Sequence, residues 1–167
     1  MSVTKLILTQ LHYRAWANAE LHASLQSVSA EAPPQELHTI IRILNHAYVV
    51  DRIFEGHLQR RPHGYEAVNT KETPSAANLG QAVKDLDAWY LGYVETLTPE
   101  ELDEPIDFTF TDGKPGRMTR SEMLLHVASH SAYHRGQVSR MLIAASAAPP
   151  RDGLATFLHL SGVRAAA

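Results

Sequence analysis

Apolar residues recur at intervals of four and three along one segment of this chain, and this spacing constrains the fold most strongly. Because it keeps the apolar side chains on one face of an α-helix, it predicts a bundle helix over residues 78–97. Similar reasoning predicts helices over 4–27 and 35–59 and a last long helix ending near Ala145. The residues that carry the 78–97 pattern are Leu79, Val83, Leu86, Tyr90, Tyr93 and Leu97.

The connections between these helices favour an all-α four-helix bundle with one long crossover. Residues 60–77 form a long polar connection, which is uncommon in a compact domain unless it crosses over or covers a functional site. Residues 106–110 alternate like a strand, and Asp112-Gly113 is typical of a turn, so a small hairpin is expected before the last long helix. Thr119 to Glu122 form a capping box that starts that helix. We interpret residues 1–167 as a single domain.

Composition excludes several classes of function. The chain has 167 residues, 44% of them hydrophobic, a net charge of −3 and no cysteine. No basic stripe is visible, so we expect no nucleic-acid partner. The lack of cysteine removes disulfides and thiolate ligands, and no apolar run approaches the roughly 20 residues that span a bilayer. These features predict a cytoplasmic protein without a membrane partner.

Three histidines stand one helical turn apart where the last long helix should present its apolar stripe: His126, His130 and His134. Imidazoles four residues apart lie about 6 Å from one another, which lets two of them share an ion such as Zn²⁺. His126 and His134 are about 12 Å apart along the axis, too far for one ion. Spacing alone therefore leaves two pairs open, His126 with His130 or His130 with His134.

A third ligand must come from another helix. His46 is the best candidate, because it lies in the most hydrophobic predicted helix, where an imidazole needs a partner. His22 and His12 on the first helix are weaker candidates. The remaining histidines lie near the ends of elements or in connections and are predicted to be solvated: His38, His57, His63 and His159.

The alternative is a hydrogen-bonded polar seam without an ion. In that interpretation Asn18, Tyr48 and Asp51 satisfy the histidines of the last long helix. A core histidine bonded to a backbone carbonyl is more common than a metal ligand, so spacing alone does not decide between these two hypotheses.

The residues around the histidines also resemble the DinB family of damage-inducible bundle proteins, which is unrelated to the polymerase of that name. The most specific match is Tyr133-His134-Arg135-Gly136-Gln137, preceded by His126 and His130. Together the matching stretches cover nearly the whole chain. The other stretches are Tyr13 to Asn18, Leu44-Asn45-His46 followed by Asp51-Arg52-Ile53-Phe54, and Pro149-Pro150-Arg151-Asp152.

This resemblance implies a four-helix bundle with a long crossover that forms a homodimer. It also implies a divalent-metal site with one histidine from the second helix and two from the last long helix. Carried over to this chain, the ligands are His46, His130 and His134, and His126 is a neighbour. Histidine nitrogen suits zinc, nickel, copper, cobalt and iron, of which zinc or nickel is expected.

Three neutral nitrogen ligands leave a coordination position open for water or substrate. Since some members of the wider superfamily use low-molecular-weight thiols, the resemblance implies a metal-dependent transferase or hydrolase that acts on a small molecule. A thiol S-transferase or a related detoxification enzyme with a thiol cosubstrate is the leading hypothesis. The alternative is a non-catalytic metal-binding stress protein whose ion stabilises the bundle.

Several polar residues could orient the ligands from behind. Arg135 is expected to face away from His134 and to act as a structural ion-pair partner, because it lies about 100° further round the helix. The candidates for orienting the imidazoles are Asp51, Tyr48, Asn18 and Gln137.

Overall fold

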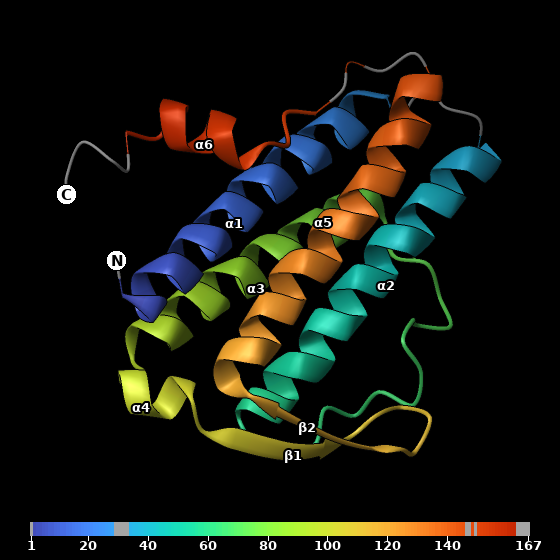
Figure 1. Cartoon of the computed structure of the whole chain (residues 1–167). Coiled ribbons are helices and arrows are strands. Elements are labelled where there is room, and N and C mark those ends of the chain that lie inside the picture. The colour runs from blue at the N-terminus through green and yellow to red at the C-terminus, as the bar shows by residue number, and fades with distance from the viewer. Residues whose placement is uncertain (1, 29–33, 146–147, 149, 163–167) are drawn as a thin grey trace.

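The structure is a computed structural model that describes residues 2–28, 34–145, 148 and 150–162; Pro149 of the C-terminal motif lies outside them. Within the described residues the chain forms six helices and a two-stranded hairpin, and four of the helices are long (Figure 1). The predicted all-α bundle is confirmed. The elements are α1 (Val3–Val28), α2 (Pro34–Leu58), α3 (Ala76–Glu95), α4 (Pro99–Leu102), β1 (Pro105–Thr109), β2 (Pro115–Thr119), α5 (Arg120–Ala144) and α6 (Leu154–Leu160).

The long connection between α2 and α3 sets the directions of the four long helices. Residues 59–75 run along the outside of α2 and return to the end of the bundle where α2 began (Figure 1). As a result α2 and α3 run in the same direction, while α1 and α5 run in the opposite one. Helix α1 packs against α3 and α5, and α2 packs mainly against α5. None of the described helices is long and apolar enough to cross a membrane.

The hairpin leads directly into α5 and fixes where that helix begins. Strand β1 pairs antiparallel with β2, and Pro105 lies opposite Thr119. The strand starts one residue earlier than predicted. The Thr119 hydroxyl accepts a hydrogen bond from the backbone N–H of Glu122, and the Glu122 carboxylate accepts one from the N–H of Thr119. This is the predicted capping box, which satisfies two N–H groups at the start of the helix.

A layer of buried polar side chains divides the core into two apolar clusters. The cluster nearer the hairpin includes Leu11, Tyr90 and Val127, and the other includes Leu21 and Val138. Between these two clusters, the long helices carry polar residues at the same level along the bundle axis. Each of these side chains is at most 6% exposed: Arg14, Asn18, Asp51, Asp87, Ser131 and Arg135.

Arg14 holds this layer together across three helices. Its guanidinium lies 2.5 Å from Asp51 Oδ2 on α2 and 3.0 Å from Asp87 Oδ1 on α3. The Asn18 amide donates to Asp87 Oδ2 at 2.9 Å, and the Tyr90 hydroxyl donates to the backbone oxygen of Asp51 at 2.6 Å. Charges buried this deeply persist only when each is paired or hydrogen-bonded. The layer therefore fixes how α1, α2 and α3 align along the bundle axis.

Replacing Arg14 by Ala removes the only guanidinium within ion-pair distance of Asp51 and Asp87 among the described residues. Because two carboxylates would remain in the core without a counter-charge, we expect the free energy of unfolding to fall by about 3–5 kcal/mol. The matched control is Arg117→Ala, since the Arg117 and Asp107 side chains are 63% and 74% exposed. An exposed pair contributes at most about 1 kcal/mol. Equal losses of the two variants in urea denaturation would contradict a buried, paired layer.

Candidate metal centre

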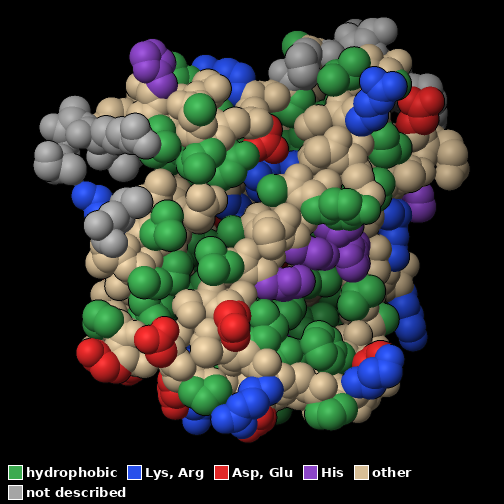
Figure 2. Space-filling view, viewed as in Figure 1, with side chains coloured by type: hydrophobic (Ala, Val, Ile, Leu, Met, Phe, Trp, Pro, Cys, Tyr) green, Lys and Arg blue, Asp and Glu red, His purple; other side chains and the backbone are tan. Residues whose placement is uncertain are grey.

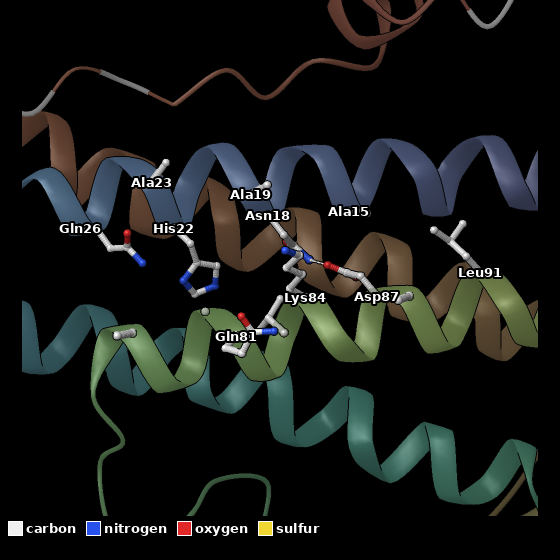
Figure 3. Close-up of a pocket in the computed structure, with 14 residues that line it drawn as sticks. Ala15, Asn18, Ala19, His22, Ala23, Gln26, Gln81, Lys84, Asp87 and Leu91 are labelled. Carbon is white, nitrogen blue, oxygen red and sulfur yellow. Dashed lines mark hydrogen bonds between the residues drawn. The ribbon is translucent and has the colours of Figure 1, made fainter.

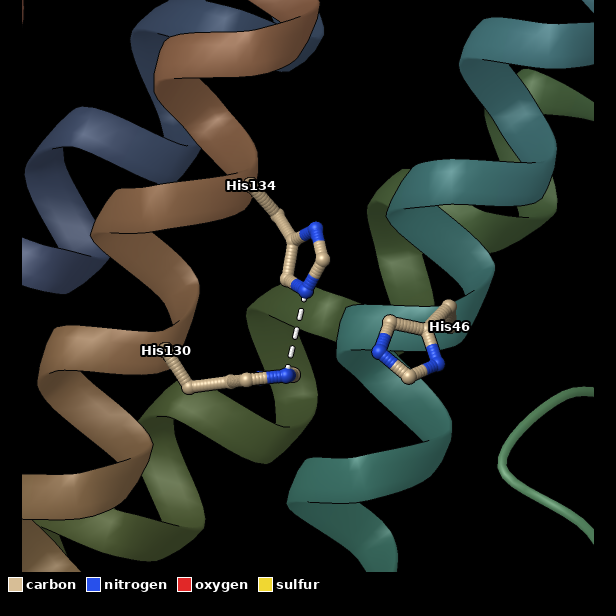
Figure 4. Close-up of side chains that lie close together, drawn as sticks. All are labelled: His46, His130 and His134. Carbon is tan, nitrogen blue, oxygen red and sulfur yellow. Dashed lines mark hydrogen bonds between the residues drawn. The ribbon is translucent and has the colours of Figure 1, made fainter.

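Three imidazoles face one another across the seam between α2 and α5. His130 and His134 lie one turn apart on α5, and His46 points toward them from α2 (Figure 4). The ring centroid of His46 lies 5.2 Å from that of His130 and 4.8 Å from that of His134. All three side chains are half-buried. The structure therefore brings together the three histidines that the resemblance indicated.

The nitrogen atoms of this triad converge closely enough to share one ion. His130 Nε2 and His134 Nε2 are 3.1 Å apart, and one nitrogen from each of the three rings lies within 4.8 Å of the others. Zn–N bonds of about 2.0–2.1 Å at tetrahedral angles place neighbouring nitrogens roughly 3.3 Å apart. The pair on α5 already meets this spacing. With a nitrogen of His46 also within 4.8 Å, the chemistry and spacing of the three residues fit a divalent ion.

Hydrogen bonds behind the triad fix the tautomer of two rings. His46 Nδ1 lies 2.8 Å from the backbone oxygen of Val68, and His134 Nδ1 lies 2.8 Å from Gln137 Oε1. Both oxygens can only accept, so each Nδ1 carries the hydrogen. The Nε2 atoms of both rings then present lone pairs. This is the arrangement that second-sphere carbonyl groups give to metal-bound histidines.

Burial keeps two of these rings neutral. Burial and, to a lesser extent, the neighbouring imidazoles together lower the pKa of His130 to about 3. Burial also lowers the pKa of His134, although the hydrogen bond with Gln137 opposes this shift. A metal ligand must be unprotonated, so a depressed histidine pKa favours metal binding at neutral pH.

His126 lies beside the triad but is not part of the convergent group. Its ring stacks on His130, with centroids 5.3 Å apart, and on Phe54, with centroids 4.6 Å apart. Of the two pairs that spacing left open, only His130 with His134 is joined to His46 in a cluster able to hold an ion. His126 instead shields the hairpin side of His130.

The crossover contains the Val68 backbone oxygen, which accepts a hydrogen bond from His46. No pattern in the sequence had pointed to the side chains that hold this oxygen in place. The Asn69 side chain donates to the backbone oxygen of Arg42 at 3.0 Å and accepts a hydrogen bond from Asn45. Asn45 also donates to Thr70 Oγ1 at 2.7 Å. We call Asn45, Asn69 and Thr70 the crossover clamp. It ties the crossover to α2 immediately beside Val68.

Of the predicted orienting residues, Gln137 is the one that bonds a triad imidazole among the described residues. Asp51 and Asn18 belong to the polar layer instead, which argues against the polar seam. Arg135 is 2% exposed and pairs with Asp152 at 2.9 Å. This confirms its predicted role as a structural ion-pair partner. Tyr133 stands exposed beside the site, with its ring centroid 5.1 Å from that of His134.

Two other histidines are partly or fully buried away from the triad. His57 is half-buried because the hairpin covers it, and its ring lies 4.7 Å from that of Phe108. Burial and the nearby His63 lower its pKa to about 4, so the prediction that it is solvated was wrong. His22 is buried at the floor of a groove of about 420 Å³ between α1 and α3 (Figure 3). No triad histidine lines that groove.

Comparison with known proteins identifies the family. The family model described as DinB family matches residues 1–162. The chain belongs to the DinB family. It is 25% identical over 161 residues to Protein DinB of Bacillus subtilis (strain 168), an alignment that covers 87% of this chain and 91% of that protein. No solved structure matches the chain significantly. The similarity to the family therefore extends over almost the full length of this chain.

The depressed pKa of His130 predicts how the stability of the chelator-treated protein depends on pH. The unfolded chain protonates this ring near its ordinary pKa of 6.5, whereas the folded protein protonates it only near 3. Acidification within this window therefore favours the unfolded state. The stability is fully present above about pH 6.5 and falls as the pH decreases toward 3.

We expect His130→Gln to flatten this acid limb in denaturant unfolding measured over a pH series. His12→Gln, at an exposed position on α1, serves as the control and should leave the slope unchanged. Identical slopes for wild type and His130→Gln would show that the ring is not desolvated as described.

Proposed function

We propose that this protein is a metal-dependent enzyme that binds one divalent ion through His46, His130 and His134. The observation that carries the proposal is the convergence of three imidazole nitrogens from two helices, with Nδ1 of two rings already bonded to oxygen acceptors. Membership of the DinB family agrees with it. Zinc or nickel is the ion we propose among the metals that imidazole nitrogen suits, in line with the family resemblance.

The triad is only half-buried, so an ion bound there could be reached from solvent. Three protein nitrogens leave at least one coordination position open, the usual arrangement of catalytic rather than structural sites. Histidine side chains gather at the surface along the seam between α5 and α2 (Figure 2), so this position can face solvent. When bound there, a divalent ion lowers the pKa of water toward about 7 or ionises a thiol.

The chain's own residues would orient the ligands and receive a small organic substrate. Gln137 and the Val68 carbonyl hold the His134 and His46 rings in the ligating tautomer. Tyr133 offers an exposed aromatic face next to the open side. On the family resemblance we propose thiol S-transfer or a related detoxification reaction, carried out by a homodimer in the cytoplasm. A low-molecular-weight cosubstrate would supply the thiol, which is compatible with a chain that has no cysteine.

A second candidate is a non-catalytic metal-binding stress protein. It is favoured by the position of the triad, because an ion there would join α2 to α5 and stabilise the bundle by mass action. A large loss of thermal stability on chelation, with no exchangeable water on the bound ion, would favour this role. A modest loss with an exchangeable water would favour the enzyme.

The metal content of tag-free protein tests the site itself. We expect about one equivalent of divalent metal per chain in the wild type, since three imidazoles complete one site. His134→Ala should lose it, because two histidines remain. The matched control is His126→Ala, which removes a neighbouring imidazole outside the convergent group and should keep the metal. Equal metal in wild type and His134→Ala, by elemental analysis, would rule out the triad.

The crossover clamp predicts a second effect on affinity. Asn69→Ala removes the bond to the Arg42 carbonyl and the acceptor for Asn45, so the Val68 carbonyl loses its support. Second-sphere changes of this kind cost about 10–100-fold in metal affinity. Thr73→Ala is the control, because it removes a crossover contact with His38 away from the triad. An unchanged zinc affinity for Asn69→Ala would show that the clamp does not position the ligand.

A further inference from the structure

Together with Asp152, which pairs with Arg135, the polar layer has three carboxyl groups and two guanidinium groups. Asp51 and Asp87 both face Arg14, which carries one charge. The other buried guanidinium, Arg135, is already paired with Asp152. Two carboxylates that share one cation in a low-dielectric interior cannot both stay ionised without cost. With both carboxyl groups ionised, Arg14, Asp51 and Asp87 together carry one net negative charge. One bound proton would neutralise it.

Two oxygens of this group are free to carry that proton. Asp51 Oδ1 and Asp87 Oδ1 are buried and take part in no hydrogen bond with the described residues, although Asp87 Oδ1 lies 3.0 Å from the guanidinium as an ion pair. Buried polar atoms normally have a partner, so these oxygens require one. A proton on Asp51 Oδ1 would remove its negative charge and so lower the cost of leaving that oxygen without a partner. Burial, opposed only in part by Arg14, raises the pKa of the Asp51 carboxyl to about 7.

A small cavity connects this group with the metal centre. It has a volume of about 20 Å³, and both Asp51 and His134 line it. A volume of about 10–15 Å³ is enough for one water, provided that polar atoms surround it. Asn18, Tyr48 and Ser131 supply further polar groups to its wall. Because Asp51 and His134 line the same buried cavity, a charge at the triad would act on the Asp51 carboxyl through the protein interior, where screening is weak.

Every packed element contributes groups that face Asp51. Helix α5 brings Arg135, whose charge favours the ionised carboxyl. On α2, Glu55 is engaged by Arg52 and Arg61, at 2.7 and 2.9 Å. On α1 and α3, Figure 3 shows the Asn18–Asp87 hydrogen bond and the His22 ring directed toward α3. The remaining groups are Arg14 and the neutral His22 on α1, Asp87 and Tyr90 on α3, and Tyr48 on α2.

From these observations we infer that the Asp51–Asp87 pair binds one proton in the metal-free protein and releases it when a divalent ion occupies the triad. This inference rests on the proposed function. In the step, the O–H bond of the Asp51 carboxyl breaks, its electron pair stays on the carboxylate, and the proton leaves through the cavity to solvent. The positive ion supplies the counter-charge that Arg14 alone does not. By linkage, deprotonation of the pair must strengthen metal binding to the same extent.

The number of protons released on zinc binding tests the inference. Titration calorimetry of tag-free, metal-free protein with Zn²⁺, in buffers of different ionisation enthalpy at about pH 6.5, counts these protons. We expect the wild type to release about one proton more than Asp51→Asn, in which the single remaining carboxylate, Asp87, is balanced by Arg14 and binds no proton. Asp87→Asn should show the same deficit, because one carboxylate then faces one guanidinium. Asp107→Asn, at an exposed pair on the hairpin, is the control and should match the wild type.

A measurement on the wild type alone covers the case in which neither buried variant folds. The infrared carbonyl stretch of a protonated carboxyl group should be present in the metal-free protein and disappear on addition of zinc. Zinc binding with equal proton counts in all variants, or a carboxyl band that is absent or persists, overturns this inference and leaves the proposed function intact. A protein that binds no zinc overturns the proposed function itself.

Discussion

The buried Arg14 guanidinium is the interaction on which the arrangement of the helices depends. It joins α1 to Asp51 of α2 and Asp87 of α3, and all three groups lie in the layer between two apolar clusters. Apolar contacts alone tolerate sliding of one helix along another, whereas a buried ion pair does not, since any shift leaves a charge without a partner. The height of α2 in the bundle, and with it the height of His46, follows from this constraint.

The metal centre uses the alignment that the polar layer sets. His46 lies somewhat more than one turn before Asp51 on α2, and His134 directly precedes Arg135 of the layer on α5. The same layer that fixes both helices thus brings the imidazoles of two helices to one point. The crossover adds the last element, because the Val68 carbonyl determines which nitrogen of His46 is free to bind. Backbone and side-chain hydrogen bonds behind the ligands therefore link the arrangement of the helices to the proposed metal binding.

Much of the architecture could be predicted from local sequence signals. The four-and-three spacing of apolar residues predicted α3, the Thr119 capping box predicted the start of α5, and the strand over 106–110 was displaced by one residue. For the site, spacing narrowed the α5 ligands to two pairs, and the family resemblance chose between them. Cluster geometry agrees with that choice. The role of these histidines as ligands remains a proposal.

The rest depended on contacts between distant segments. The partner of His46 is a backbone oxygen of Val68, and a backbone atom leaves no residue-type signal in a sequence. Three different helices contribute Arg14, Asp51 and Asp87, so no local pattern shows that the two carboxyl groups share one guanidinium. His57 lies at a helix end and looked solvated, but packing of the hairpin against α2 buries it.

In the proposed site, imidazoles from α2 and α5 bind one divalent ion. X-ray absorption spectroscopy of tag-free, zinc-loaded protein would report these ligands. We expect three imidazole nitrogens at about 2.0–2.1 Å from zinc and at least one further light-atom ligand from solvent. Fewer than three imidazoles, or a spectrum that does not change in His46→Ala, would contradict it.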